Sequence, residues 1–274
     1  MARASILVTT DLSVRSDRSV DRGLALANQL DMDALVLHVI DGRTARPAAH
    51  DRVIALFMDD FGPLAPGARF TTEFGESAEV IANVAARNES PIVVAGVSHL
   101  NEAKDLVLGT TVERLVRESP APVLVVKRRP RKPYDRLLIA SDLSESSREA
   151  LETAARLFPA AALRMIHVYR APFQGFLNRE SVIDYTRSQA ECELNHFLRK
   201  LAPQTRRRLD VVLQEGETIS GAIADAASDW VADLVVAGSH GRSGIAHALI
   251  GSRAVEILDF VPLDTLVVRA RGLP

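Results

Sequence analysis

One segment near the end of the chain combines glycines, hydroxyl side chains and arginines at a spacing suited to binding an anion. The segment VVAGSHGRSGIAHALIGSRAVEIL runs from Val235 to Leu258. It leaves a predicted strand, passes three glycines and reaches Gly251 and Ser252 at the start of a predicted helix. Glycine lets backbone N–H groups approach a ligand, and a helix N-terminus adds unpaired donors and a positive dipole end. The segment predicts a phosphate cradle; the simpler alternative is a glycine-rich surface loop that caps a helix.

Other motifs and the composition exclude several classes of protein. The sequence has no P-loop motif, G-x-x-x-x-G-K-[ST], and no dinucleotide-binding motif, G-x-G-x-x-G after a strand. It also lacks the G-x-S-x-G nucleophile elbow and the H-E-x-x-H motif of zinc hydrolases. The 33 Lys+Arg against 35 Asp+Glu give a net charge of −2, which argues against a nucleic-acid or anionic-membrane partner. The single cysteine fits a reducing compartment. No apolar run approaches the ~18 residues of a membrane span. We therefore expect a cytoplasmic protein.

The chain contains two diverged copies of one sequence unit. ILVTTDLSVRSDRSVDRGLALA, from Ile6, matches LLIASDLSESSREALETAARLF, from Leu137. The offset between the copies is 131 residues at this point and 142 further on, so the second copy contains a longer insert. We expect one domain over 1–128, a basic, proline-containing linker over 129–134 and a second domain over 135–274. The run KRRPRKPY around this linker predicts a solvated segment, or alternatively a patch for nucleic acid or an acidic partner.

Short apolar runs alternate with helical patterns in each copy. In the second copy we expect strands at 136–141, 162–168, 208–213, 233–238 and 264–269, and helices at 144–158, 178–202, 218–229 and 251–260. The strands lack in/out alternation, which is typical of parallel strands buried on both faces. This pattern predicts an α/β fold of two tandem doubly wound domains. Each has a five-stranded parallel sheet with helices on both faces and a ligand at the carboxyl ends of the strands.

Several conspicuous side chains are expected to be structural. Tyr185 lies in the apolar stripe of the long predicted helix, and Cys192 of the same helix is expected to be buried or half-buried. Trp230 and Phe260 are interpreted as packing residues. His38 and His167 occupy the same place in the two copies, beside the expected site, and are interpreted as hydrogen-bonded structural histidines.

The second copy resembles a universal stress protein domain of the ATP-binding kind, whose motif is G-x2-G-x9-G-[ST]. Gly238, Gly241 and Gly251-Ser252 fit this spacing. The resemblance also includes Asp142, the pair His167-Val168 and the closing TLVVR strand. It spans 135–270, and the internal repeat extends it to 3–127. The chain is therefore similar to a tandem universal stress protein.

The resemblance implies which residues bind a nucleotide. Asp142 and Val168 would hold the adenine, with Ser141 beside them. The ribose and phosphates would be held by Gly238, Ser239, His240, Gly241, Arg242, Ser243, Gly244, Gly251, Ser252 and Arg253. The ligand would be ATP, ADP or AMP, and the sequence leaves open whether Mg²⁺ accompanies it.

The first copy departs from the motif. Its equivalents of the site residues are Asp11, Val39, Gly96, His99, Glu102, Gly109 and Thr110. His99 and Glu102 replace two loop glycines, and Glu102 and Asp105 put carboxylates where phosphate charge would lie. We therefore expect this copy to bind nucleotide weakly or not at all. A metal site of His38 and His99 is an alternative.

The favoured function is a nucleotide-binding regulatory protein of the stress response, with no catalytic residues assigned. The alternative is a slow ATPase or a nucleotide-dependent transferase of the adenine-nucleotide α-hydrolase-like group; an interaction scaffold without nucleotide is a third possibility. The resemblance also implies a protein partner of unknown identity. It further implies pairing through the last strand of each domain, either in a homodimer or within the chain.

Overall fold

The computed structural model describes residues 3–14, 16–40, 53–55, 57, 59, 68–97, 99–100, 106–107, 109–170, 179–239 and 251–270. The chain divides into two compact units. Unit 1 comprises Met1–Pro133 together with Leu263–Arg269, and unit 2 comprises Tyr134–Pro262 with Ala270–Pro274. The last strand of the second sequence copy therefore belongs to unit 1.

Unit 1 is built on a twisted sheet with the strand order β12-β7-β4-β1-β2-β3. The strands are β1 (Ser5–Thr10), β2 (Asp33–Ile40), β3 (Arg69–Phe74), β4 (Val93–Gly96), β7 (Val123–Val126) and β12 (Thr265–Val268). The first copy's five strands pair in parallel, whereas β12 pairs antiparallel with β7. The central strands are buried on both faces, which explains their continuous apolar sequences.

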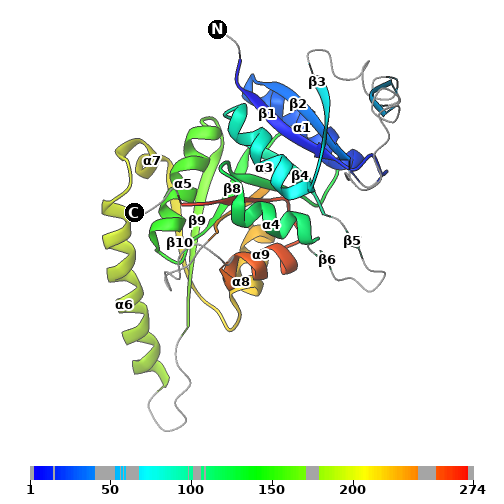
Figure 1. The fold of residues 1–274 in the computed structure, drawn as a ribbon. Coiled ribbons are helices and arrows are strands. Elements are labelled where there is room, and N and C mark those ends of the chain that lie inside the picture. Colours follow the sequence, from blue (N-terminus) through cyan, green and yellow to red (C-terminus); the bar gives the residue numbers. More distant parts are fainter. Residues whose placement is uncertain are drawn as a thin grey trace. The chain divides into compact units, whose positions relative to one another are not determined.

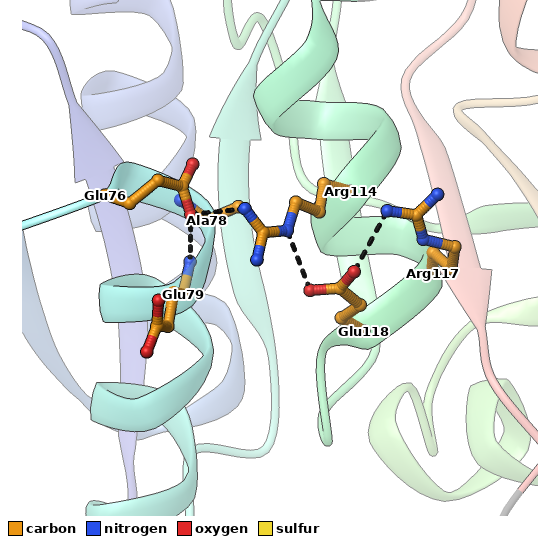
Figure 2. A network of polar contacts seen from close by, with 6 residues as sticks. All are labelled: Glu76, Ala78, Glu79, Arg114, Arg117 and Glu118. Carbon is orange, nitrogen blue, oxygen red and sulfur yellow. Dashed lines mark hydrogen bonds and ion pairs between the residues drawn. The ribbon is translucent and has the colours of Figure 1, made fainter. Parts of the chain in front are cut away.

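Three helices of unit 1 cover this sheet. They are α1 (Asp17–Leu30), α3 (Ser77–Arg87) and α4 (Thr110–Glu118). Right-handed crossovers place α1 on one face and α3 with α4 on the other (Figure 1). The carboxylate of Glu76 caps α3 by accepting from the amides of Ala78 and Glu79, and Arg114 of α4 joins it to Glu118 (Figure 2).

Unit 2 contains four parallel strands in the order β10-β9-β8-β11. They are β8 (Arg136–Ala140), β9 (Ala162–Tyr169), β10 (Leu209–Glu215) and β11 (Leu234–Gly238). The chain leaves β8 toward β9 on one side and later returns to β11 on the other. The carboxyl ends of β8 and β11 therefore form a topological switch point, where ligands of doubly wound folds bind.

The helices of unit 2 are α5 (Glu145–Leu157), α6 (Arg179–Arg199), α7 (Pro203–Arg208), α8 (Ile219–Asp229) and α9 (Ser252–Phe260). The α/β class and the doubly wound layout predicted from the sequence are confirmed, and four of these helices were expected at nearly these bounds. The short helix α7 was not predicted. Its start is capped from a distance, because the amide of Ala202 and the hydroxyl of Thr205 donate to the carboxylate of Glu152.

Three expectations about individual side chains were wrong. Cys192 and Tyr185 are exposed, because α6 presents most of its described surface to solvent. Phe260, at the end of α9, is also exposed. The expected solvated linker is largely exposed over 128–133, as predicted, but it is anchored at both ends: Lys127 is buried, and Tyr134 is buried with its ring edge-to-face against Phe158.

The expectation for Trp230 agrees with the structure, because the guanidinium groups of Arg136 and Arg164 lie 5.1 and 4.7 Å from the centre of its ring. No helix in the described part of the chain is both long enough and apolar enough to cross a membrane.

Candidate functional site

A cavity of about 390 Å³ opens at the carboxyl ends of the unit 2 strands. Its walls come from the ends of β8, β9 and β11, from α5 and α8, and from the first turns of α9. Seven of the residues expected from the sequence line it: Ser141, Asp142, Val168, Gly238, Gly251, Ser252 and Arg253. The volume falls within the roughly 300–1,000 Å³ of small-molecule pockets. The fold thus brings residues from widely separated parts of the chain into one concave site.

The turn after β8 forms one wall, and its backbone is strained. Leu143 has a φ of 62°, in the left-handed region that costs an L-residue about 1–2 kcal/mol. Two side chains stabilise this turn: the Leu143 amide donates to the Ser141 hydroxyl at 3.1 Å, and the Ser144 amide donates to Asp142 Oδ1 at 3.0 Å. The Ser141 hydroxyl in turn donates to Ser147 at the start of α5. The Asp142 carboxylate is thereby fixed at the mouth of the cavity.

His167 and Val168 of β9 form the adjacent wall. The Nδ1 atom of His167 lies 2.8 Å from the carbonyl oxygen of Ser141. A carbonyl only accepts hydrogen bonds, so Nδ1 carries the proton and the ring links β9 to the end of β8. His38 makes the same contact with Thr10 in the first copy, at 3.0 Å. Both histidines therefore have the structural role expected of them.

Gly238 at the end of β11 lines the cavity, but packing alone requires a glycine there. A Cβ at this position would lie 2.5 Å from Ser146 Oγ and 2.8 and 2.9 Å from the carbonyl carbon and oxygen of the same residue. The sequence predicted that glycine here lets the backbone approach a ligand; in the structure, Ser146 of α5 also packs closely against Gly238. Ser239, which follows, is fully buried, is not among the cavity-lining residues, and accepts a hydrogen bond at its carbonyl from the Gly251 amide at 2.8 Å.

The N-terminus of α9 faces the same cavity. Gly251 is its N-cap and has no side chain to accept from the helix amides. The amides of Ala254 and Val255 donate to the Gly251 carbonyl, whereas those of Ser252 and Arg253 belong to the set that a helix cannot satisfy internally. The Arg253 guanidinium lies 3.8 Å from Glu256 Oε2. Glu256 also accepts from the backbone amide and hydroxyl of Ser220, so it connects α9 to the start of α8. This end of the site is electropositive and suited to an anion.

The apolar walls were not predicted from the sequence. They are formed by Ala140, Ile166, Ile219, Ile223, Ala237, Ala254 and Ile257. Ile219 and Ile223 are one helical turn apart at the start of α8. That spacing was available as a signal, but it does not distinguish a cavity wall from an ordinary core face.

Five residues of the predicted loop, His240, Gly241, Arg242, Ser243 and Gly244, lie outside the described residues. So does Glu102 of the first copy. His99 is described only as part of the two-residue strand β5 (His99–Leu100), which pairs antiparallel with β6 (Leu106–Val107). These two strands were not predicted.

The first copy retains the strained turn after its first strand. Leu12 has a φ of 61°, and Asp11 Oδ1 accepts from the Ser13 amide at 2.9 Å and from the Ser13 hydroxyl at 2.6 Å. Partial burial opposes ionisation of Asp11, but the hydrogen bonds from Ser13 outweigh it and lower the pKa of this carboxyl below its ordinary value. Val39 is the last residue but one of β2, Gly96 ends β4, Gly109 is the N-cap of α4, and Thr110 is the first residue of that helix. Among the described residues of either unit, no three His, Cys, Asp or Glu side chains are grouped closely enough to hold a metal.

These features define a class of protein: tandem doubly wound α/β units, one with a cavity at its switch point beside an uncapped helix N-terminus. The model of the universal stress protein family matches residues 3–127 and 133–269. The chain therefore belongs to this family, in the form of two tandem domains.

Individual relatives agree with this assignment. The chain is 30% identical over 152 residues to Universal stress protein A homolog 1 of Coxiella burnetii, covering 49% of this chain and 96% of that protein. It is 25% identical over 153 residues to Universal stress protein Sll1388 of Synechocystis, covering 50% and 98%. A solved universal stress protein structure from Archaeoglobus fulgidus shares the fold over 99% of this chain and 100% of its own, with a TM-score of 0.66 at 20% identity.

Proposed function

We propose that this universal stress protein is a cytoplasmic regulatory protein that binds one adenine nucleotide, ATP, in the cavity of unit 2. One observation carries the proposal: a cavity of about 390 Å³ in which three strand ends meet the uncapped N-terminus of α9. An apolar wall opposite a positive helix end suits a ligand with a flat apolar part and an anionic part.

The described residues divide between these two parts of the ligand. Val168 and the isoleucines of α8 would contact the adenine, and the fixed Asp142 carboxylate would accept from its amino group. The amides of Ser252 and Arg253 would donate to the phosphates, with the Arg253 guanidinium adding charge. Gly241, Arg242, Ser243 and the other residues of the 240–250 loop would complete the phosphate cradle, as the family motif implies.

Nucleotide binding would act as a signal rather than as the start of a turnover cycle. The two residues that flank the 240–250 loop are neighbours, because the Ser239 carbonyl accepts from the Gly251 amide, and Gly251 lines the cavity. A phosphate held there would favour one arrangement of this loop over others, and a protein partner in the stress response would recognise that arrangement.

The test is nucleotide binding by the full chain. Heat release followed by mass spectrometry should identify about one adenine nucleotide per chain, and calorimetry with and without Mg²⁺ should give the affinity for ATP. Arg253→Glu should weaken binding by about tenfold or more, because it reverses charge at the helix end. Thr111→Glu, at the equivalent position of α4, is the matched control and should leave the affinity unchanged. The bound nucleotide should remain ATP over time. An empty site at millimolar ATP, or an unaltered affinity of Arg253→Glu, would rule out this placement.

A further inference from the structure

A buried ion pair in unit 1 joins α1 to the residue that precedes β12. The Nε atom of Arg22 lies 3.4 Å from Asp264 Oδ2, and the two side chains are 7% and 2% exposed. The same guanidinium donates from Nη1 to the carbonyl oxygen of Lys132 at 3.0 Å. Charges taken this far out of water are expensive to bury, so each needs the other.

The second oxygen of Asp264 ties the end of β7 to the start of β12. Asp264 Oδ1 accepts from the amides of Lys127 at 2.7 Å and Arg128 at 3.0 Å. The Lys127 ammonium, also buried, lies 3.4 Å from the Thr265 hydroxyl. These contacts fit the antiparallel register, in which Thr265 faces Val125 and Leu266 faces Leu124. The Asp264 carboxylate thus holds the residues that follow β7 next to the residue that precedes β12.

The strands themselves do not specify which pairs with which. β7 reads VLVV and β12 reads TLVV, and both are fully buried. By the repeat offset, Leu124 and Leu266 are equivalent, so β7 could pair with β7 of a second chain, and β12 with β12, in the same central register. Apolar packing would be nearly the same in all three arrangements.

The ion pair distinguishes these arrangements, because each of the two sequence copies within the chain contains only one of the two charged residues. At the offset of 131, Arg22 corresponds to Thr153, and at the offset of 142, Asp264 corresponds to Pro122. Pairing of β7 with β7 would bury two Arg22 side chains and put Pro122 where each needs a carboxylate. Pairing of β12 with β12 would bury two Asp264 side chains beside Thr153. Only β7 with β12 brings Arg22 and Asp264 together.

We propose that Arg22 and Asp264 form a specificity lock that selects β12, and not a second β7, as the partner of the β7 edge, against pairing of like strands between two copies of the chain. A buried ion pair adds little net stability but strongly penalises any arrangement that leaves one charge alone. This inference is independent of the nucleotide site.

The experiment traps the strand pairing by disulfide formation in the full chain. Leu124→Cys and Leu266→Cys are introduced with Cys192→Ser, the protein is refolded from urea and oxidised, and mass spectrometry of the linked peptides identifies each disulfide. With the lock intact, the 124–266 linkage within one chain should dominate. Arg22→Thr, the residue of the other copy, should raise the 124–124 and 266–266 linkages by about tenfold, equivalent to about 1.4 kcal/mol of lost specificity.

Two controls separate specificity from stability. Arg22→Lys keeps a buried cation and should keep the 124–266 linkage. Arg208→Thr removes a guanidinium that donates to the carbonyls of Phe158 and Ala161 in unit 2, so it should destabilise the protein without changing the linkages. Like-strand linkages in the locked protein, unchanged linkages in Arg22→Thr, or an equal rise in Arg208→Thr would each overturn the proposal.

Discussion

The Nδ1 atom of His167 donates to the carbonyl oxygen of Ser141, 26 residues earlier in the chain, at 2.8 Å. That carbonyl belongs to the residue before Asp142, and the left-handed Leu143 follows. One side chain of β9 therefore holds the strained turn in which the proposed adenine-binding carboxylate sits. His38 and Thr10 repeat the relationship in the first copy.

Replacing His167 should therefore weaken nucleotide binding without direct contact to phosphate. His167→Leu removes the donor, whereas the amide nitrogen of His167→Asn can occupy the place of Nδ1 and keep the hydrogen bond. We expect His167→Leu to lower the free energy of unfolding by about 1–2 kcal/mol, and His167→Asn to lower it less. Urea denaturation measures this effect even if no nucleotide binds.

The affinity for ATP is the second measurement on these variants. It should fall several-fold in His167→Leu, because Asp142 is no longer held in place, and recover largely in His167→Asn. His38→Leu breaks the equivalent bond in unit 1 and should leave the affinity unchanged. Equal stability of the Leu and Asn variants would contradict the role assigned to this bond.

Replacing the equivalent glycines Gly238 and Gly96 by alanine should reduce stability by different amounts. A Cβ at Gly238 meets the backbone of Ser146 at 2.8 and 2.9 Å, whereas at Gly96 the nearest atom is the Ser19 hydroxyl at 3.3 Å. A backbone cannot move aside as a side chain does. We expect Gly238→Ala to cost about 2–3 kcal/mol of stability and Gly96→Ala less than about 1 kcal/mol. Thermal and urea unfolding of the two variants would show the ranking, and a reversed order would be inconsistent with the packing of α5 on β11.

The strand and helix bounds of the second copy were largely predictable because its strands are short apolar runs buried on both faces. The expected strand 162–168 is observed at 162–169, and the expected helix 218–229 at 219–229. Local sequence carries such information, since the spacing of apolar residues and the capping residues act within a few positions of the chain. The fold class followed from the alternation of strands and helices.

Features that depend on distant partners were not predictable. Lys127 looked like part of a solvated linker, but its amide donates to Asp264, 137 residues away. Helix α7 starts where Glu152 of α5 caps it. Ile219 and Ile223 have the helical spacing of core residues, and only the packing of α8 beside β9 makes them a cavity wall. Each case requires knowledge of which elements are neighbours, which a single sequence does not provide.

In the network shown in Figure 2, Glu76 takes part in both a helix cap and a surface ion pair, and two substitutions measure their contributions to stability separately. Glu76 accepts from the amides of Ala78 and Glu79 at 3.3 and 3.0 Å and also pairs with Arg114 at 2.7 Å. Glu76→Ala removes the cap of α3 and should cost about 1 kcal/mol. Arg114→Gln leaves the cap intact and should cost less than Glu76→Ala, with a loss that decreases further at high salt, because its ion pairs with Glu76 and Glu118 are exposed to solvent. Urea unfolding at two salt concentrations distinguishes the two; a larger loss in Arg114→Gln would show that the ion pairs matter more than the cap.

The turn at Asp11 should make unit 1 sensitive to acid. Hydrogen bonds from Ser13 lower the pKa of Asp11 below its ordinary value despite its partial burial. A carboxyl with a lowered folded-state pKa stabilises the fold above its unfolded pKa of about 3.9, and this contribution is lost as the pH falls through the folded value. Asp11→Asn keeps an acceptor oxygen for Ser13 but does not titrate. The stability difference between the native chain and Asp11→Asn should therefore be present at pH 5–7 and shrink below about pH 4. Urea unfolding across this range, with an NMR titration of the Asp11 carboxyl, measures both quantities. A midpoint at or above the ordinary value for aspartate would show that burial, not the turn, dominates at this position.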